Sequence, residues 1–168
     1  MTLSMYEASA PTFIRKLNSL DAILVKAQAH ATAKKIDPAV LLNSRLFPDM
    51  FPLLRQIQIA TDHAKGAMAR LADVELPKYE DTEQSIEDIR ARLAKTIAFV
   101  GSFDAAQIDG SEEAAITLKV GGQERSFDGI NYLIGFALPN FYFHVVTAYS
   151  ILRHNGVEIG KRDYMGNP

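Results

Sequence analysis

The 168-residue chain contains no cysteine and no tryptophan. The lack of cysteine excludes disulfide bonds, thiolate metal ligands and cysteine nucleophiles. It is also typical of cytosolic proteins, so we expect a cytoplasmic location. A chain of this length can bury a hydrophobic core without covalent cross-links, and we expect a single domain over residues 1–168.

An excess of positive charge and long apolar runs are also missing. Eighteen basic residues stand against twenty acidic residues, which gives a net charge of −2. This balance provides no large positive field for a nucleic-acid backbone or an anionic lipid surface. No stretch approaches the roughly 20 apolar residues that span a bilayer, and residues 1–7 lack the pattern of a leader. We therefore expect no nucleic-acid partner and no membrane association.

Histidine pairs with metal-ligand spacing are absent as well. The four histidines are at positions 30, 63, 144 and 154, and no two of them share one helix face at i and i+4. Metal sites in helical bundles usually draw two ligands from such a pair. One turn before His144 the chain has Asn140, and one turn after it Ala148. We therefore predict no metal site and no cofactor.

Apolar residues that recur at spacings of three and four predict four long helices. The first covers residues 4–33, and the second, with the strongest periodicity, covers residues 50–72. The third begins at a cap near Asp81 and ends at Gly101, and the fourth covers residues 139–156. The order of these elements is typical of a helical bundle.

Between the third and fourth helices the pattern changes to that of a small β-hairpin. Residues 116–120 alternate between apolar and polar, Gly121 and Gly122 follow, and residues 123–127 form the returning strand. The two glycines suit the positive φ angles of a tight turn. We predict an all-α, four-helix bundle with a β-hairpin inserted before the last helix, where a long crossover can change the up-down order.

The last predicted helix is apolar on nearly all sides. A seam of residues faces the bundle, and three further apolar residues, Tyr142, Phe143 and Val146, project from the other side. A helix that is apolar all round is normally covered on both sides. The outer cover is either a further segment of the chain, such as the hairpin, or a second subunit. We expect a homodimer or a larger assembly in which Tyr142, Phe143 or Val146 is covered.

His144 is the leading candidate for a functional residue, because its position on the last helix points toward the core. One interpretation is a neutral core histidine satisfied by hydrogen bonds, with Asn140 and Thr147 on the same flank. The other is a role in ligand binding or proton transfer. Tyr149 is either a packing residue or a hydroxyl donor at a pocket.

A second row of polar residues runs along the second predicted helix. Gln56, His63 and Arg70 recur at intervals of seven residues, near the boundary between core and surface. His63 follows Asp62 directly, but adjacent residues of a helix diverge by 100° and do not face each other. The sequence therefore indicates no catalytic dyad at His63.

Several motifs together resemble a known bacterial family of unknown function. They are RLFPDMFPL at 45–53, ARLA at 69–72, PNFYFH at 139–144, AYSILRHNG at 148–156 and GKRDY at 160–164. The resemblance covers nearly the whole chain. The family is placed in the DinB-like (YfiT-like) superfamily of four-helix bundles, which includes metal-dependent thiol transferases and stress-associated proteins.

The resemblance has implications for the site. Superfamily members with a metal use one histidine on the second helix and a pair on the last, and these positions resemble Gln56, His144 and Ala148 here. One ligand of three is kept, which implies a degenerate metal site. The implied function is small-molecule binding or a stress-associated role, with a site at Gln56, Asn140, His144 and Tyr149. The alternatives are a metal-dependent or His144-dependent transferase or hydrolase, and a dimeric interaction protein without catalysis.

Overall fold

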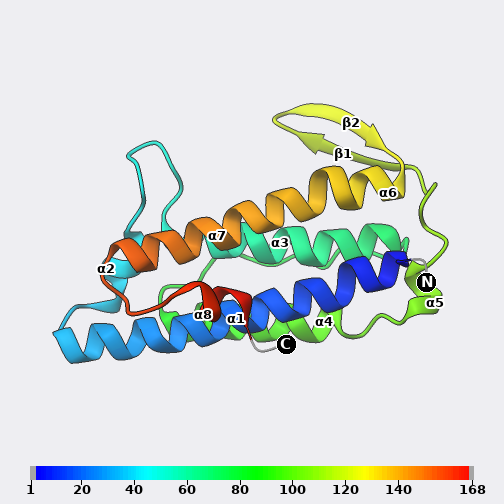
Figure 1. Ribbon diagram of the computed structural model, residues 1–168. Coiled ribbons are helices and arrows are strands. Elements are labelled where there is room, and N and C mark those ends of the chain that lie inside the picture. Colours follow the sequence, from blue (N-terminus) through cyan, green and yellow to red (C-terminus); the bar gives the residue numbers. More distant parts are fainter. Residues whose placement is uncertain (1–2, 167–168) are drawn as a thin grey trace.

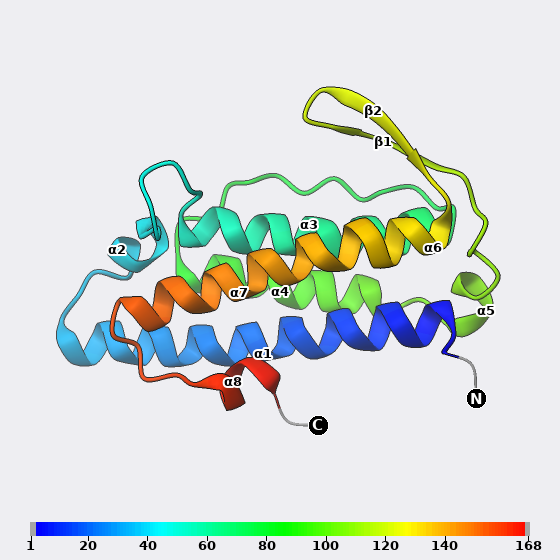
Figure 2. The same cartoon turned by 45° about the horizontal axis from the view of Figure 1, so that its top comes forward.

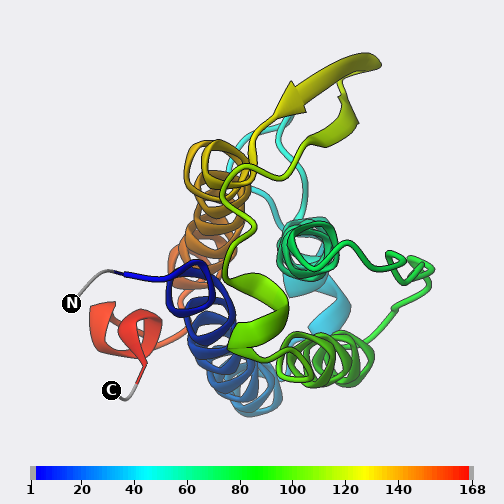
Figure 3. The ribbon, with the colours of Figure 1, turned by 90° about the vertical axis from the view of Figure 1, so that its right-hand side faces the viewer.

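The structure, a computed structural model, describes residues 3–166 and contains four long helices packed as a bundle (Figure 1). They are α1 (Met5–Lys34), α3 (Leu53–Leu71), α4 (Ile86–Val100) and α7 (Leu138–His154). Seen along the bundle, α1 and α3 lie at opposite corners, and each packs against both α4 and α7 (Figure 3). The predicted all-α bundle with a hairpin before its last helix is confirmed.

The chain direction differs from a simple up-down order. Helices α3 and α4 run in the same direction, because the extended segment 72–85 returns along the length of α3 (Figure 2). The connection between α4 and α7 leaves and rejoins the bundle at the same end, with the hairpin reaching back over the helices (Figure 2). The long crossover therefore follows α3, and its predicted place at the hairpin is wrong.

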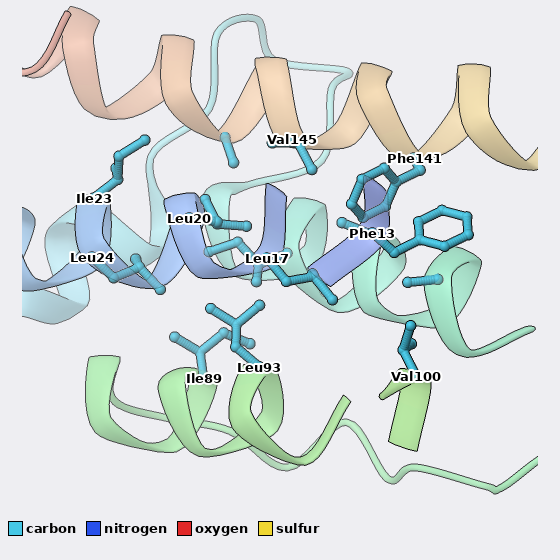
Figure 4. Close-up of a cluster of buried hydrophobic side chains, with 14 of the residues drawn as sticks. Phe13, Leu17, Leu20, Ile23, Leu24, Ile89, Leu93, Val100, Phe141 and Val145 are labelled. Carbon is cyan, nitrogen blue, oxygen red and sulfur yellow. The ribbon is translucent and has the colours of Figure 1, made fainter. Parts of the chain in front are cut away.

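Helix α1 supplies one continuous apolar stripe to the core. Its side chains lie between those of α4, such as Leu93, and those of α7, such as Val145 (Figure 4). The ring of Phe13 meets the ring of Phe141 edge-on, with centroids 4.9 Å apart. Burying one such side chain contributes about 1.5–3 kcal/mol, so this stripe is a main source of stability.

The helix starts follow local capping chemistry. Ser4 caps α1, and Asp37 caps the short helix α2 (Pro38–Asn43). Helix α3 begins at Leu53 and not at residue 50, because Pro52 precedes it in an extended conformation. Helix α4 begins after Ser85, whose hydroxyl accepts a hydrogen bond from the Asp88 amide in a capping box. The predicted cap near Asp81 is wrong, because that carboxylate pairs with two arginines.

A short helix, α5 (Ala105–Ile108), leads into the hairpin of β1 (Ile116–Val120) and β2 (Gln123–Phe127). The strands are antiparallel, with Val120 opposite Gln123, and φ is 58° at Gly121 and 82° at Gly122. These are the positive angles expected of a tight two-residue turn. The hairpin packs against the bundle through one face, since Leu118 and Phe127 contact the core while most of β2 is exposed.

The last helix contains a wide turn. It continues from α6 (Gly129–Asn131) through a π-helical segment, η1 (Tyr132–Ala137), into α7, so Pro139 lies inside it. Proline has no amide hydrogen, and a π-helical turn relieves the interrupted α-helical bonding. The Asn140 side chain donates a hydrogen bond to the Phe136 carbonyl oxygen at 2.7 Å. The wide turn also keeps residues spaced by four on one buried face: Leu133, Ala137, Phe141 and Val145.

The C-terminal segment ends in a short helix, α8 (Lys161–Met165), which has no periodicity in the sequence. It packs against α1. The Lys16 ammonium donates to the Tyr164 carbonyl oxygen at 2.9 Å, and Lys26 pairs with Asp163 at 2.6 Å. Specific polar contacts therefore hold this segment where an apolar stripe is lacking.

Candidate functional site

A cleft of about 810 Å³ lies between α3, η1, the crossover and the hairpin. It is lined by His63 of α3, by Tyr132 and Phe136 of η1, and by residues 76–79 and 118–121. Small-molecule sites in proteins commonly occupy roughly 300–1,000 Å³ and combine apolar walls with a few oriented polar groups. This cleft has both properties.

Behind the cleft, Gln56 orients His144. The His144 Nδ1 atom lies 2.7 Å from Gln56 Oε1, and both side chains are buried. Gln56 Nε2 donates to the Phe51 carbonyl oxygen at 3.0 Å, which directs the amide oxygen toward the ring. Since that oxygen only accepts, His144 carries its proton on Nδ1 and leaves Nε2 as an acceptor.

The ring of His63 stacks on that of His144, with centroids 5.8 Å apart and an angle of 17° between the planes. Burial lowers the pKa of His63 to about 4, with smaller contributions from His144 and Arg70. Burial and the nearby Arg55 lower the pKa of His144 to about 4 as well. Both imidazoles are therefore neutral at pH 7, and His63 is the one that lines the cleft.

Residues of the seven-residue row on α3 converge on this site. Gln56 bonds to His144, His63 lines the cleft, and the Arg70 guanidinium donates to the Tyr132 hydroxyl at 3.0 Å. The row was visible in the sequence, because residues seven apart share one helix face. Judging His63 only by its sequence neighbour Asp62 missed its place in the cleft.

Of the four predicted ligand-binding residues, the structure brings three together. Gln56 and His144 are bonded to each other, and Asn140 lines the cleft. Tyr149 lies apart, with its ring edge-on to that of Tyr164 of α8 at a centroid distance of 6.1 Å. Tyr149 follows His144 by five residues, which places it about 140° further round the helix and explains this separation.

A buried arginine on α4 fixes the crossover that forms one side of the cleft. The Arg92 guanidinium pairs with Asp62 at 3.0 Å, with Asp81 at 3.0 Å and with Glu83 at 2.9 Å. Its Nε atom donates to the Thr61 hydroxyl at 2.7 Å. One side chain therefore joins α3, α4 and the extended segment.

The crossover is held at a second point by Lys65 of α3. Its ammonium donates to the Pro77 carbonyl oxygen at 2.8 Å and lies 4.1 Å from the centre of the Tyr79 ring. Lys95 of α4 lies 4.1 Å from the centre of the same ring. These cation–π contacts and the Arg92 network give the cleft an ordered outer wall.

The positions that the resemblance assigns to three metal-binding histidines hold different groups. Gln56 presents an amide, His144 an imidazole whose Nδ1 is already bonded, and Ala148 only a methyl group. Within residues 3–166, no three His, Cys, Asp or Glu side chains are arranged to hold a metal ion. The groups at these three positions do not fit a three-histidine centre.

The bundle of four long helices with a hairpin before the last of them is a DinB-like fold. The crystal structure of a DinB family member protein from Shewanella denitrificans is similar, with a TM-score of 0.89 and 42% sequence identity. The match covers 97% of this chain and 92% of that one. Residues 5–165 match the domain of unknown function DUF1993, and the chain belongs to that family. A comparison with curated proteins finds no match.

Proposed function

We propose that this DUF1993 protein binds a small molecule in the cleft over His63. The observation that carries the proposal is a cleft of about 810 Å³ in which Arg70 and Asn140 are already oriented by hydrogen bonds within the protein. Oriented groups of this kind reduce the entropy that a ligand loses on binding. The apolar surfaces of Phe136 and Leu118 provide contact area beside them.

The proposal includes the loss of the superfamily's metal centre, supported by the amide of Gln56 and the methyl group of Ala148 at two of its three positions. It also favours binding over catalysis by His144 or His63. An imidazole with a pKa of about 4 is a weak base at pH 7, whereas effective general bases have a pKa near the working pH. The neutral ring of His63, which lines the cleft, suits hydrogen bonding with a bound molecule.

A fragment screen by NMR tests the proposal. We expect hits to shift the resonances of His63 and Phe136. Leu118→Trp should fill the cleft and weaken the affinity for these hits at least about tenfold. Thr117→Trp is the matched control, because neighbouring strand residues point to opposite faces and Thr117 is exposed. The proposal fails if no fragment shifts these resonances, or if both tryptophan variants weaken the hits equally.

We further propose that the protein is a homodimer formed through the outer face of α7. Phe143 is 56% exposed and Val146 is 43% exposed, and no segment among residues 3–166 covers them. Exposed apolar groups on one helix face are typical of subunit contacts. Tyr142 is already half-buried against the core, so the expected interface is smaller than the sequence suggests.

Light scattering tests this proposal by measuring the molecular mass in solution. The wild-type protein should have twice the mass of one 18.6 kDa chain at micromolar concentration, and Phe143→Asp should reduce it to one chain. Val25→Asp, at an apolar residue of α1 that is 47% exposed, should leave the mass unchanged. A wild-type mass of one chain across the micromolar range would refute the dimer.

The proposed setting is the cytoplasm, and the proposed partners are a small molecule and a second copy of the chain. The absence of cysteine and the net charge of −2 support this setting and the lack of a nucleic-acid partner. None of the helices within residues 3–166 is long and apolar enough to cross a membrane. A stress-associated role is implied by the superfamily resemblance alone.

A further inference from the structure

Charge is distributed unevenly around the cleft. One carboxylate, that of Asp62, is set against five cationic side chains: Arg55, Lys65, Arg70, Lys78 and Lys119. Asp62 pairs with Lys65 and with Arg92 of α4, and Arg55 pairs with Asp81. Among residues 3–166, the other three cations form no ion pair. The cleft therefore carries more positive than negative charge, and within residues 3–166 the charges of Arg70, Lys78 and Lys119 are not neutralised by ion pairs.

Arg70 is the most firmly placed of these three cations. Its guanidinium donates to the hydroxyl of Tyr132, a residue whose side chain is buried in the core, and the Arg70 side chain is itself partly buried. Lys78 and Lys119 are exposed on the crossover and on β1, at the sides of the cleft. Arg70 presents a planar fork of N–H donors, which suits a carboxylate or phosphate group.

A glycine inside α3 provides the space for this guanidinium. A Cβ atom at Gly66 would lie 2.5 Å from Arg70 Nη1, much closer than such contacts occur. Glycine in a helix interior costs about 1 kcal/mol relative to alanine. Gly66 thus weakens the helix locally while it lets Arg70 fold back toward the preceding turn and the Tyr132 hydroxyl.

We propose that the cleft binds a small organic anion, a carboxylate or phosphate ester on a flat apolar body, whose charged group is held by Arg70. This inference rests on the proposed function of the cleft. Lys78 and Lys119 attract the anion from the sides, and the body lies against the ring of Phe136 and the side chain of Leu118. Gly66 is a positioning residue for the guanidinium.

The state of the imidazoles agrees with this charge distribution. Burial lowers the pKa of His63, and His144 and Arg70 lower it further. Burial also lowers the pKa of His144, with a further contribution from Arg55. Positive charge near a histidine disfavours its protonated form. An anion bound at Arg70 will offset that charge and raise the pKa of His63.

Simple probes test the ligand class. Benzoate and phenyl phosphate should bind at least about tenfold more tightly than the neutral analogue benzamide, since one charge-assisted bond contributes about 1.5–3 kcal/mol. Benzoate should raise the His63 pKa in an NMR titration, whereas benzamide should not. Comparing the two anions distinguishes a carboxylate site from a phosphate site.

Variants separate charge from position. Arg70→Gln should abolish the preference for benzoate over benzamide. Gly66→Ala should weaken benzoate binding about tenfold, with no loss of stability and no effect on benzamide, because it displaces the guanidinium and keeps its charge. Gly135→Ala is the matched control, since it is also helical and no neighbouring atom lies within 4 Å of its added Cβ.

Equal affinities for benzoate and benzamide in the wild-type protein would overturn the anion assignment and leave the small-molecule site intact. The same holds if Arg70→Gln retains the preference. Binding of neither probe would overturn the assignment too, and the fragment screen with Leu118→Trp then decides the proposed function separately. An unchanged preference in Gly66→Ala would overturn the positioning role of that glycine.

Discussion

Arg92→Met will lower the free energy of unfolding by about 3 kcal/mol at pH 7. The guanidinium side chain is 2% exposed and is surrounded by three carboxylates, of which Glu83 is only 11% exposed. Removing the cation leaves these negative charges facing one another, and the Thr61 hydroxyl loses its donor. Most of the loss comes from Glu83, whose buried carboxylate is left without its cation, because Asp62 and Asp81 are 39% and 41% exposed and keep Lys65 and Arg55.

Arg90 on the same helix provides the control. It pairs with Asp21 through two hydrogen bonds, but its side chain is 41% exposed and solvent replaces the lost contacts. Arg90→Met should cost less than about 1 kcal/mol. Urea denaturation measures both, with the slope of the transition as a check on two-state behaviour. Equal losses for the two variants would show that the Arg92 network is not a main support of the crossover.

The two histidines of the site will make stability depend on pH between 7 and 4. Their pKa in the folded protein is about 4, below the ordinary value of 6.5, so the unfolded chain takes up protons first as the pH falls. Stability is therefore full above pH 7 and declines as the pH falls through 6.5 toward 4. The expected slope reaches about 1.4 kcal/mol per pH unit for each imidazole.

The double variant His63→Asn, His144→Asn isolates this contribution. Carboxylates titrate in both proteins, so the difference between the wild-type protein and the variant is due to the two histidines. Denaturation at pH 7, 6 and 5 should show a steeper loss for the wild-type protein, by about 2 kcal/mol for each histidine between pH 7 and pH 5. The variant should already be less stable at pH 7, since Gln56 loses its bond to the ring. Identical slopes would mean that the rings are not held neutral by their surroundings.

The periodic helices were readily predicted from sequence, but the elements held by polar contacts were not. The apolar stripes of α1 and α3 repeat over several turns, so their existence followed directly. The crossover 72–85 and helix α8 have no such repeat, and they are fixed by Arg92, Lys65 and Lys16 from distant parts of the chain. Contacts between residues so far apart leave no periodic signal.

The site was predictable only where a residue stands out within its own helix or within a family motif. His144 was found because one polar residue on an apolar helix is conspicuous, and Gln56 followed from the family resemblance. His63 was missed because its neighbours come from η1 and α7, which its own helix does not reveal. Tyr149 lies outside the site because five residues of helix place it about 140° round from His144.

The π-helical turn at Tyr132–Ala137 also affects how this chain is compared with its relatives. A π-helical turn is equivalent to one residue inserted into an α-helix, and it rotates everything before it by about 100° relative to everything after it. A relative with a regular α-helix here has one residue fewer in this turn. Its sequence aligns correctly on both sides of the turn only if a one-residue gap is placed before Phe141. Without the gap, the cleft residues Tyr132 and Phe136 would be matched to residues on another face of the relative's helix, and function would be transferred to the wrong side chains.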